Sequence, residues 1–206
     1  MYPIILTGGI GSGKTTVANI FKTQHGIDVI CADQCAKEVI KLPEVIQTIK
    51  QSFNSYIVNP KGQINRTKLR QLISQNNEAR IWLNNIMHPN IRKNIEDKLK
   101  QSQSIYTIVD IPLLNQENVA NYPYLKKIIC VYASLETRID RIIERDNQTN
   151  EQALAIIQSQ ITDYERHKFS DFIINNNEDL IVLMPKIKKI HQELRLIAIK
   201  SQIPKK

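Results

Sequence analysis

The sequence predicts an α/β fold with three layers, in which helices cover both faces of a parallel sheet of five strands. Five short apolar runs alternate with segments of helical spacing, and a glycine cluster follows the first run. Parallel neighbours need a long crossover, usually a helix, so this alternation indicates parallel pairing. With 206 residues, 42% of them hydrophobic, the chain is long enough to bury one such core.

The first strand is predicted over residues 4–7, where Ile-Ile-Leu-Thr leads directly into the glycines. Apolar residues then recur at helical spacing up to Gly26, a residue type that commonly ends helices. Residues 27–31 predict the second strand, which we expect to end at Asp33. The chain therefore begins as strand, glycine loop, helix and strand.

A helical insertion is predicted over residues 34–104, where apolar residues are spaced by three and four and the pattern breaks near Pro43 and His88-Pro89. Three further strands are expected, at 105–110, 127–133 and 171–175. Helical spacing links and follows them over 135–143, 153–161 and 180–199. We therefore divide the chain into three parts: a core of 1–33, 105–134 and 170–206, the insertion 34–104, and a helical region 135–169.

The composition restricts the partners and the compartment. A formal charge of +8 and a pI near 9.4 favour anionic partners, such as nucleic acid, acidic membrane surfaces or phosphorylated small molecules. No apolar run is long enough to span a bilayer and no basic leader precedes the first strand, so we expect a cytoplasmic protein. The three cysteines indicate reduced thiols, and their spacing does not match a zinc site.

Four of the chain's six glycines lie between residues 8 and 13. The stretch fits the phosphate-binding motif G-x-x-x-x-G-K-[ST] in its usual setting between a strand and a helix. In this motif backbone N–H groups and the helix N-terminus surround a phosphate chain. Lys14 would bridge the β- and γ-phosphates of a nucleoside triphosphate, and the Thr15 hydroxyl would ligate Mg²⁺. The predicted ATP-binding residues are Gly8, Gly9, Gly11, Ser12, Gly13, Lys14, Thr15 and Thr16.

Two aspartates follow predicted strands. Ligands of open parallel sheets bind beyond the carboxyl ends of the strands, where Asp33 and Asp110 are expected. Asp110 would bind the metal directly or through water, although an Asp at this place is often only a turn or cap residue. Asp33 would accept a proton from the attacking hydroxyl or orient it, and would also bind Mg²⁺. The predicted metal ligands are therefore Thr15, Asp33 and Asp110.

Three arginines, Arg138, Arg141 and Arg145, are spaced by three and four along the helix predicted after the fourth strand. Taken alone, this spacing is typical of a solvated basic face. Beside a triphosphate, an arginine-bearing helix can neutralise the transferring group while it excludes water. We therefore predict four catalytic residues, Lys14, Asp33, Arg141 and Arg145.

Together these features resemble those of the dephospho-coenzyme A kinases, members of the P-loop kinase group. The likeness runs along the whole chain. It rests on Leu6-Thr7-Gly8-Gly9-Ile10-Gly11-Ser12-Gly13-Lys14-Thr15-Thr16, Ala32-Asp33, Gly62-Gln63-Ile64-Asn65-Arg66, His88-Pro89, Asp110-Ile111-Pro112-Leu113-Leu114, Arg141 to Asp146, Gln160, and Ser170-Asp171 leading to Asn175-Asn176. Two departures stand out, because the family commonly has Asp where this chain has Cys31, and an apolar residue and Glu where it has Asn115-Gln116.

The resemblance implies transfer of the ATP γ-phosphate to the ribose 3′-hydroxyl of dephospho-coenzyme A, the last step of coenzyme A synthesis. The insertion 34–104 would bind the acceptor, and residues 135–169 would form a lid. Substrate contacts are expected at Asp33, Arg66, His88, Pro112 and Leu113. A structural role for His88, as a cap before proline, is equally consistent with the sequence.

Three alternatives differ in function class. Another small-molecule kinase would share the sheet, but the long insertion favours an extended acceptor. A GTPase-type switch would need an Asn-Lys-x-Asp guanine reader, which the sequence lacks. A nucleic-acid-binding ATPase is favoured only by the positive charge, and no basic run is interleaved with aromatic residues. We therefore expect ATP and dephospho-coenzyme A as partners, with no nucleic acid, membrane or obligate protein partner.

Overall fold

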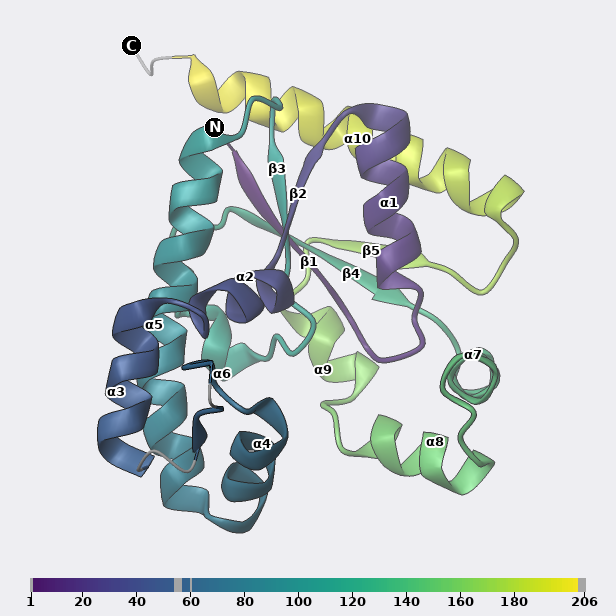
Figure 1. Cartoon of the computed structure of the whole chain (residues 1–206). Coiled ribbons are helices and arrows are strands. Elements are labelled where there is room, and N and C mark those ends of the chain that lie inside the picture. The colour runs from purple at the N-terminus through teal and green to yellow at the C-terminus, as the bar shows by residue number, and fades with distance from the viewer. Residues whose placement is uncertain (1, 54–56, 60, 204–206) are drawn as a thin grey trace. The chain divides into compact units, whose positions relative to one another are not determined.

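Five strands form one parallel sheet in the computed structural model, which describes residues 2–53, 57–59 and 61–203. The strand order is β2-β3-β1-β4-β5 (Figure 1). The strands are β1 (Pro3–Gly8), β2 (Asp28–Cys31), β3 (Thr107–Asp110), β4 (Lys127–Tyr132) and β5 (Phe172–Asn175). The predicted α/β fold with five parallel strands is confirmed.

The strand order puts β1 in the middle of the sheet. It pairs with β3 on one side, Leu6 opposite Asp110, and with β4 on the other, Leu6 opposite Ile129. The chain thus extends the sheet in both directions from β1, and ligands of such sheets bind beyond the carboxyl ends of the strands at the switch point. The glycine loop leaves β1 at this end of the sheet.

The helices α1 (Lys14–His25) and α10 (Leu180–Gln202) cover one face of the sheet (Figure 1). Ile4 and Leu6 point into their shared core with Phe21. The alternate residue Ile5 is also buried, at 1% exposure. A parallel sheet is buried on both faces, which is why its strands are continuously apolar and do not alternate with polar residues.

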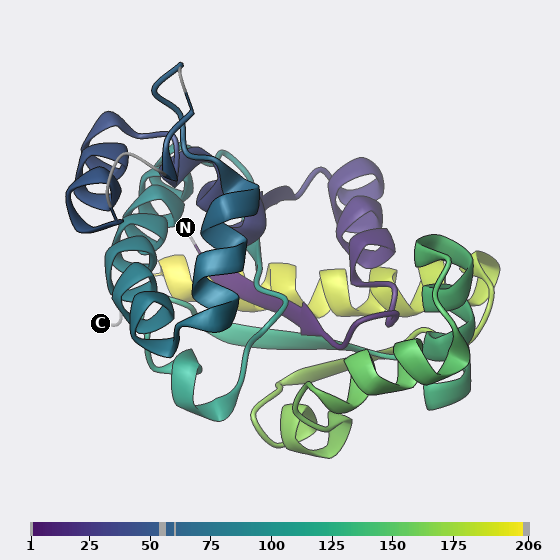
Figure 2. The same cartoon turned by 60° about the horizontal axis from the view of Figure 1, so that its bottom comes forward.

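Four helices lie between β3 and β5: α6 (Gln116–Val119), α7 (Leu135–Asp146), α8 (Asn150–Gln158) and α9 (Asp163–Lys168). Figure 2 shows α7, α8 and α9, in green, grouped beside the loop that follows β1. The starts of the last two are set by capping boxes, in which Thr149 and Thr162 exchange hydrogen bonds with Gln152 and Glu165. Helical spacing predicted α7 and α8 but missed the shorter α6 and α9.

The chain divides into two compact units. The first unit consists of Met1–Cys31 together with Leu99–Lys206, and the second consists of Ala32–Lys98. The second unit contains α2 (Ala32–Val39), α3 (Pro43–Phe53), α4 (Arg66–Gln75) and most of α5 (Asn77–Gln101). They surround their own core, which includes Val39, Ile49, Leu69 and Leu83. Residues 135–169 fall within the first unit.

Two predicted boundaries are wrong. The strand β2 ends at Cys31, and Asp33 lies in the first turn of α2, where the positive end of the helix dipole favours a carboxylate. His88-Pro89 does not break the insertion, because α5 continues through Pro89. Pro89 lacks the N–H that would donate to the Asn85 carbonyl, and on the same turn the side-chain amide of Asn90 donates to the Ile86 carbonyl at 2.8 Å.

Two features bear on the chain's environment. No helix among the described residues is both long and apolar enough to cross a membrane. All three cysteines are free, and burial raises the pKa of Cys130 to about 11. The Cys130 thiol is therefore protonated at neutral pH and serves as a small apolar core residue.

Two histidines, one at the end of α1 and one in α10, stack against each other on the sheet face that these helices cover. The rings of His25 and His191 stack at 4.3 Å, and the Tyr106 hydroxyl lies 2.9 Å from His191 Nδ1. Burial lowers the pKa of both histidines; Lys188 lowers that of His25 further, and His25 and Arg195 lower that of His191. The fold therefore favours the neutral form of each ring.

We expect the free energy of unfolding to decrease as the pH falls below about 6.5, the pKa of histidine in the unfolded chain. Below this pH the unfolded state binds protons that the folded state resists, so linkage favours unfolding. Urea unfolding at pH 7.5 and 5.5 measures the loss. The variant His191→Gln should lose less stability over this range than the wild type, and an equal loss in both would contradict the prediction.

Candidate active site

The phosphate loop connects β1 to α1, and its glycines meet neighbours that leave no room for side chains. Gly11 and Gly13 have φ values of 77° and 81°, which most L-residues avoid. A Cβ atom on Gly11 would lie only 2.7 Å from the backbone carbonyl oxygen of Arg138 in α7. The glycines are therefore required both by the backbone conformation and by the close approach of α7.

The outward side of the loop is hydrogen-bonded to distant parts of the chain. Three loop carbonyls accept bonds from side chains: Ile10 O from Arg138 Nε at 2.8 Å, Gly11 O from Arg141 Nη1 at 3.3 Å, and Ser12 O from Asn176 Nδ2 at 2.8 Å. The Ile10 N–H donates to Gln160 Oε1 at 3.0 Å. The N–H groups of the first turn of α1 have no partner within the helix and remain suited to an anion.

Lys14 and Asp110 form an ion pair at the carboxyl ends of β1 and β3. Their side chains are 15% and 10% exposed. The sequence predicted both residues for the site, and the structure brings them into contact. Thr15 and Thr16 follow Lys14 on the first turn of α1 and are exposed. Asp110 therefore holds the lysine by charge at this end of the sheet, and the next residue, Thr15, is exposed.

A buried ion cluster supports the loop from behind. Asp163 accepts from Arg138 and from Arg166, each at 2.9 Å, through its two carboxylate oxygens. The two arginines are only 4% and 2% exposed. Arg166 also donates to Gln160 Oε1 at 3.2 Å, the atom that accepts from Ile10. The cluster therefore contacts the loop twice, through Arg138 and through Gln160.

The electrostatics of this cluster are those of two cations around one anion. Burial lowers the pKa of Arg138; Asp163 opposes this effect and Arg166 adds to it. Arg138 Nη2 is buried with no hydrogen-bond partner among the described residues. A net positive charge therefore lies behind a loop whose front is suited to phosphate.

The three predicted arginines do not act alike. Arg138 and Arg141 both bind the loop backbone, and Arg141 also donates to the Asn176 carbonyl at 2.9 Å. Arg145 pairs with its neighbour Asp146, and its side chain is 62% exposed. The structure thus brings Arg141 to the loop but not Arg145, and the burial of Arg138 rules out a solvated face for that residue.

The remaining predicted site residues lie in two different units. Pro112 and Leu113 follow β3 in the first unit, and Leu113 is 68% exposed. In the second unit, Arg66 begins α4 and donates to the Lys37 carbonyl at 3.4 Å. His88 lies within α5, where partial burial and then Arg92 lower its pKa. Because His88 lies inside α5, it does not cap a helix end before proline.

Sequence reasoning gave no site role to Gln160, Asp163, Arg166 or Asn176. Two of them bind the loop directly: Gln160 is 150 residues away from its partner Ile10, and Asn176 is 164 residues away from its partner Ser12. No local pattern marks such residues, because their partners are brought close only by folding. The resemblance included Gln160 and Asn176 in its motifs but said nothing of what they contact.

We expect Asp163→Asn to lower the free energy of unfolding by about 3 kcal/mol, because removing one partner of a buried ion pair leaves the others uncompensated. It should also weaken ATP binding, since Arg138 no longer has its anchor behind the loop. Urea unfolding and calorimetric titration measure the two effects. The control Glu178→Gln removes a surface pair with Lys186 and should cost at most about 1 kcal/mol. Equal losses in both variants would contradict a supporting role for the cluster.

Comparisons with known proteins agree on one family. The sequence model of the dephospho-CoA kinase family matches residues 2–181. The dephospho-CoA kinase of Legionella pneumophila (strain Philadelphia 1) is 41% identical over 94% of this chain and 95% of its own length, and that of Vibrio parahaemolyticus is 38% identical over 91% and 92%.

Solved structures agree with this match. Dephospho-CoA kinase from Campylobacter jejuni superposes with a TM-score of 0.70 at 28% identity, over 94% of this chain and 96% of that one. A shikimate kinase from Bacteroides thetaiotaomicron, at 16% identity and a TM-score of 0.53, shares the fold alone. From the family match and the extent of these identities, the chain belongs to the dephospho-CoA kinase family.

Proposed function

We propose that this chain transfers the γ-phosphate of ATP to the ribose 3′-hydroxyl of dephospho-coenzyme A, which yields coenzyme A and ADP. The observation that carries the proposal is the Lys14–Asp110 ion pair beside a phosphate loop whose carbonyls are held outward. Membership of the dephospho-CoA kinase family supplies the acceptor. The shared fold of shikimate kinase shows that the sheet alone does not select an acceptor.

The phosphate loop would bind the triphosphate of ATP. Its glycine backbone and the first turn of α1 direct N–H groups at the anion, and Lys14 adds a positive charge. In the absence of phosphate that charge is balanced by Asp110. On binding, the lysine would exchange one anion for another and bridge the β- and γ-phosphates, and the Asp110 carboxylate would then face the metal instead of the lysine.

The oxygen donors at the site fit magnesium. Among the described residues, no group of three or more His, Cys, Asp or Glu side chains is placed to hold a metal ion. Mg²⁺ does not need such a group, since it commonly takes one or two protein oxygens, water and substrate phosphate. The Thr15 hydroxyl and the Asp110 carboxylate would hold it, with Asp33 as a further candidate. When bound, Mg²⁺ neutralises charge on the phosphates.

Asp33 would be the general base. It lies two residues beyond Cys31, which is in register with Asp110 at the carboxyl end of the sheet. Its carboxylate takes the proton of the 3′-hydroxyl, the oxygen forms a bond to the γ-phosphorus, and the bond from phosphorus to the bridging oxygen of ADP breaks. Position two residues past the sheet edge supports this role for Asp33.

Residues 135–169 would act as the lid and 34–104 as the acceptor lobe. Arg141 already donates to the loop, which supports a role beside the phosphates, and Arg145 would need to leave Asp146 to join it. Arg66, His88, Pro112 and Leu113 are the proposed acceptor contacts. The free cysteines support a cytoplasmic enzyme. Its proposed partners in the reaction are ATP and dephospho-coenzyme A, with no nucleic acid, membrane or obligate protein partner.

We expect Lys14→Ala to fold but to lose nearly all phosphoryl transfer, because it removes the fixed charge on the β- and γ-phosphates. Turnover of ATP and dephospho-coenzyme A is measured together with circular dichroism. The control Lys22→Ala removes an exposed lysine from the other end of the same helix and should leave the rate unchanged. A folded Lys14→Ala variant with a kcat close to that of the wild type would refute the role of Lys14.

We expect Asp33→Asn to lower kcat by about 10²- to 10⁴-fold, the usual contribution of a positioned general base. Folding and metal-free nucleotide binding should persist, because the amide has nearly the shape of the carboxylate. The rate is measured over a series of Mg²⁺ concentrations. Recovery at high Mg²⁺ would assign Asp33 to the metal instead, and an unaltered kcat at saturating substrates would remove it from the mechanism. Glu44→Gln, an acid in the first turn of α3, is the control.

A further inference from the structure

The helix α10 buries one face and exposes an apolar stripe on the other. Leu183, Ile187 and Leu194 point into the core that α10 shares with α1 and the sheet (Figure 1). The apolar residues on the outer face are separated by three, four or eleven positions, close to whole numbers of helical turns, so they follow one line along the helix. This outer stripe consists of Ile181 (84% exposed), Pro185, Leu196 (59%), Ile199 (39%) and, directly after the helix, Ile203 (63%).

The outer stripe is wider at the start of α10. There Leu180 is 55% exposed, and Val182 and Met184 are each 43% exposed. Single exposed apolar residues are ordinary on a protein surface, whereas a contiguous exposed apolar patch marks a surface that binds a partner. The proposed reaction uses no residue of α10. The outer stripe is therefore a candidate docking surface for a partner other than the two substrates.

Positive charge borders the outer stripe on both sides. Lys188 and Arg195 are seven residues apart and lie along one border, and Lys189 and Lys200 are eleven apart and lie along the other. All four side chains are exposed. The helix contains five basic residues and one acidic residue, Glu193. The partner that complements this surface is therefore anionic.

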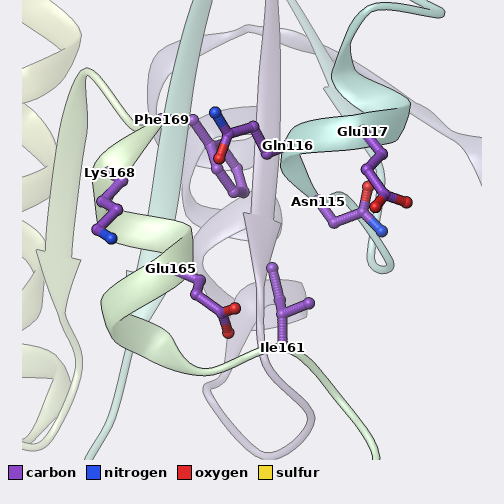
Figure 3. Close-up of a pocket in the computed structure, with 7 residues that line it drawn as sticks. All are labelled: Asn115, Gln116, Glu117, Ile161, Glu165, Lys168 and Phe169. Carbon is purple, nitrogen blue, oxygen red and sulfur yellow. The ribbon is translucent and has the colours of Figure 1, made fainter.

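Another partly apolar surface of the same unit carries a different charge pattern. Figure 3 shows the crevice between α6 and α9, in which Ile161 and Phe169 lie among Glu165 and Lys168, one charge of each sign. The outer stripe of α10 instead combines aliphatic side chains with cations alone along its borders. This combination is typical of helices that lie at the surface of an anionic bilayer, where apolar side chains enter the acyl region and lysines stay at the headgroups.

We propose that the outer face of α10 docks on the surface of an anionic phospholipid bilayer. The reaction itself needs no membrane, so this inference goes beyond the proposed function. Because the opposite face of α10 stays in the core, the helix would lie on the bilayer and not cross it. A second copy of the chain fits less well, since it would bring five basic residues against five. Nucleic acid matches the charge but not the aliphatic stripe, because bases stack on aromatic rings.

Co-sedimentation with lipid vesicles measures the docking. The wild type should bind vesicles made of equal parts phosphatidylglycerol and phosphatidylcholine, and it should not bind vesicles of phosphatidylcholine alone. Binding should weaken when NaCl is raised from about 0.1 M to about 1 M, because the Debye length falls from about 10 Å to about 3 Å. Failure to bind the anionic vesicles at low salt would overturn the proposal.

Two double variants separate the charge from the apolar stripe. Lys188→Gln with Lys189→Gln should lower the vesicle partition coefficient roughly 20-fold, because each lysine near an anionic surface contributes about fivefold. Leu196→Gln with Ile199→Gln should lower it at least about tenfold, because polar side chains replace those that enter the acyl region. All four positions are exposed, so circular dichroism and the turnover of ATP and dephospho-coenzyme A should match the wild type.

The matched control, Lys50→Gln with Lys61→Gln, removes two exposed lysines outside α10 and should leave binding close to the wild-type value. Equal losses in the control and in the lysine variant of α10 would reduce the effect to net charge and overturn the proposal. A wild type that forms dimers without vesicles, and that Leu196→Gln with Ile199→Gln makes monomeric, would assign the outer stripe to a second copy instead. Binding to a single-stranded oligonucleotide but not to vesicles, lost in both variants of α10, would assign it to nucleic acid and overturn the proposal as well.

Discussion

The structure depends on one constraint, that the backbone of the phosphate loop must turn its N–H groups toward an anion and its carbonyls away from it. A glycine backbone permits this conformation but does not hold it, since glycine has the largest conformational entropy to lose. The holding contacts come from the outward side, where Arg138, Arg141 and Asn176 donate to three successive loop carbonyls. The loop is thus preorganised by side chains that bind its outward side.

This arrangement explains why the nucleotide-binding unit contains buried charge. The guanidinium groups of Arg138 and Arg166 are almost fully buried, and a single carboxylate, that of Asp163, serves both. Burying such a cluster is costly unless its hydrogen bonds are satisfied. Here most of them are, through the loop, Asp163 and Gln160. The net positive charge that remains lies behind the phosphate loop, and it attracts an anionic substrate to the loop.

The same constraint reaches far along the chain. Gln160 accepts both from the loop at Ile10 and from Arg166 in the cluster. The conformation of the phosphate loop therefore depends on a residue that is 150 positions away in the sequence.

The sequence by itself determined the features that depend on local chemistry. Alternating apolar runs predicted the five parallel strands, and the spacing of Gly8, Gly13 and Lys14 predicted the phosphate loop, because both follow from near neighbours in the chain. The tertiary structure alone decided that Lys14 meets Asp110, that Arg138 is buried, and that Arg145 turns to Asp146. It also decided that α5 passes through Pro89, where the rest of a long helix outweighs the local preference of proline. These outcomes depend on partners far away in the sequence or on competition between contacts, and neither leaves a periodic signal that spacing can reveal.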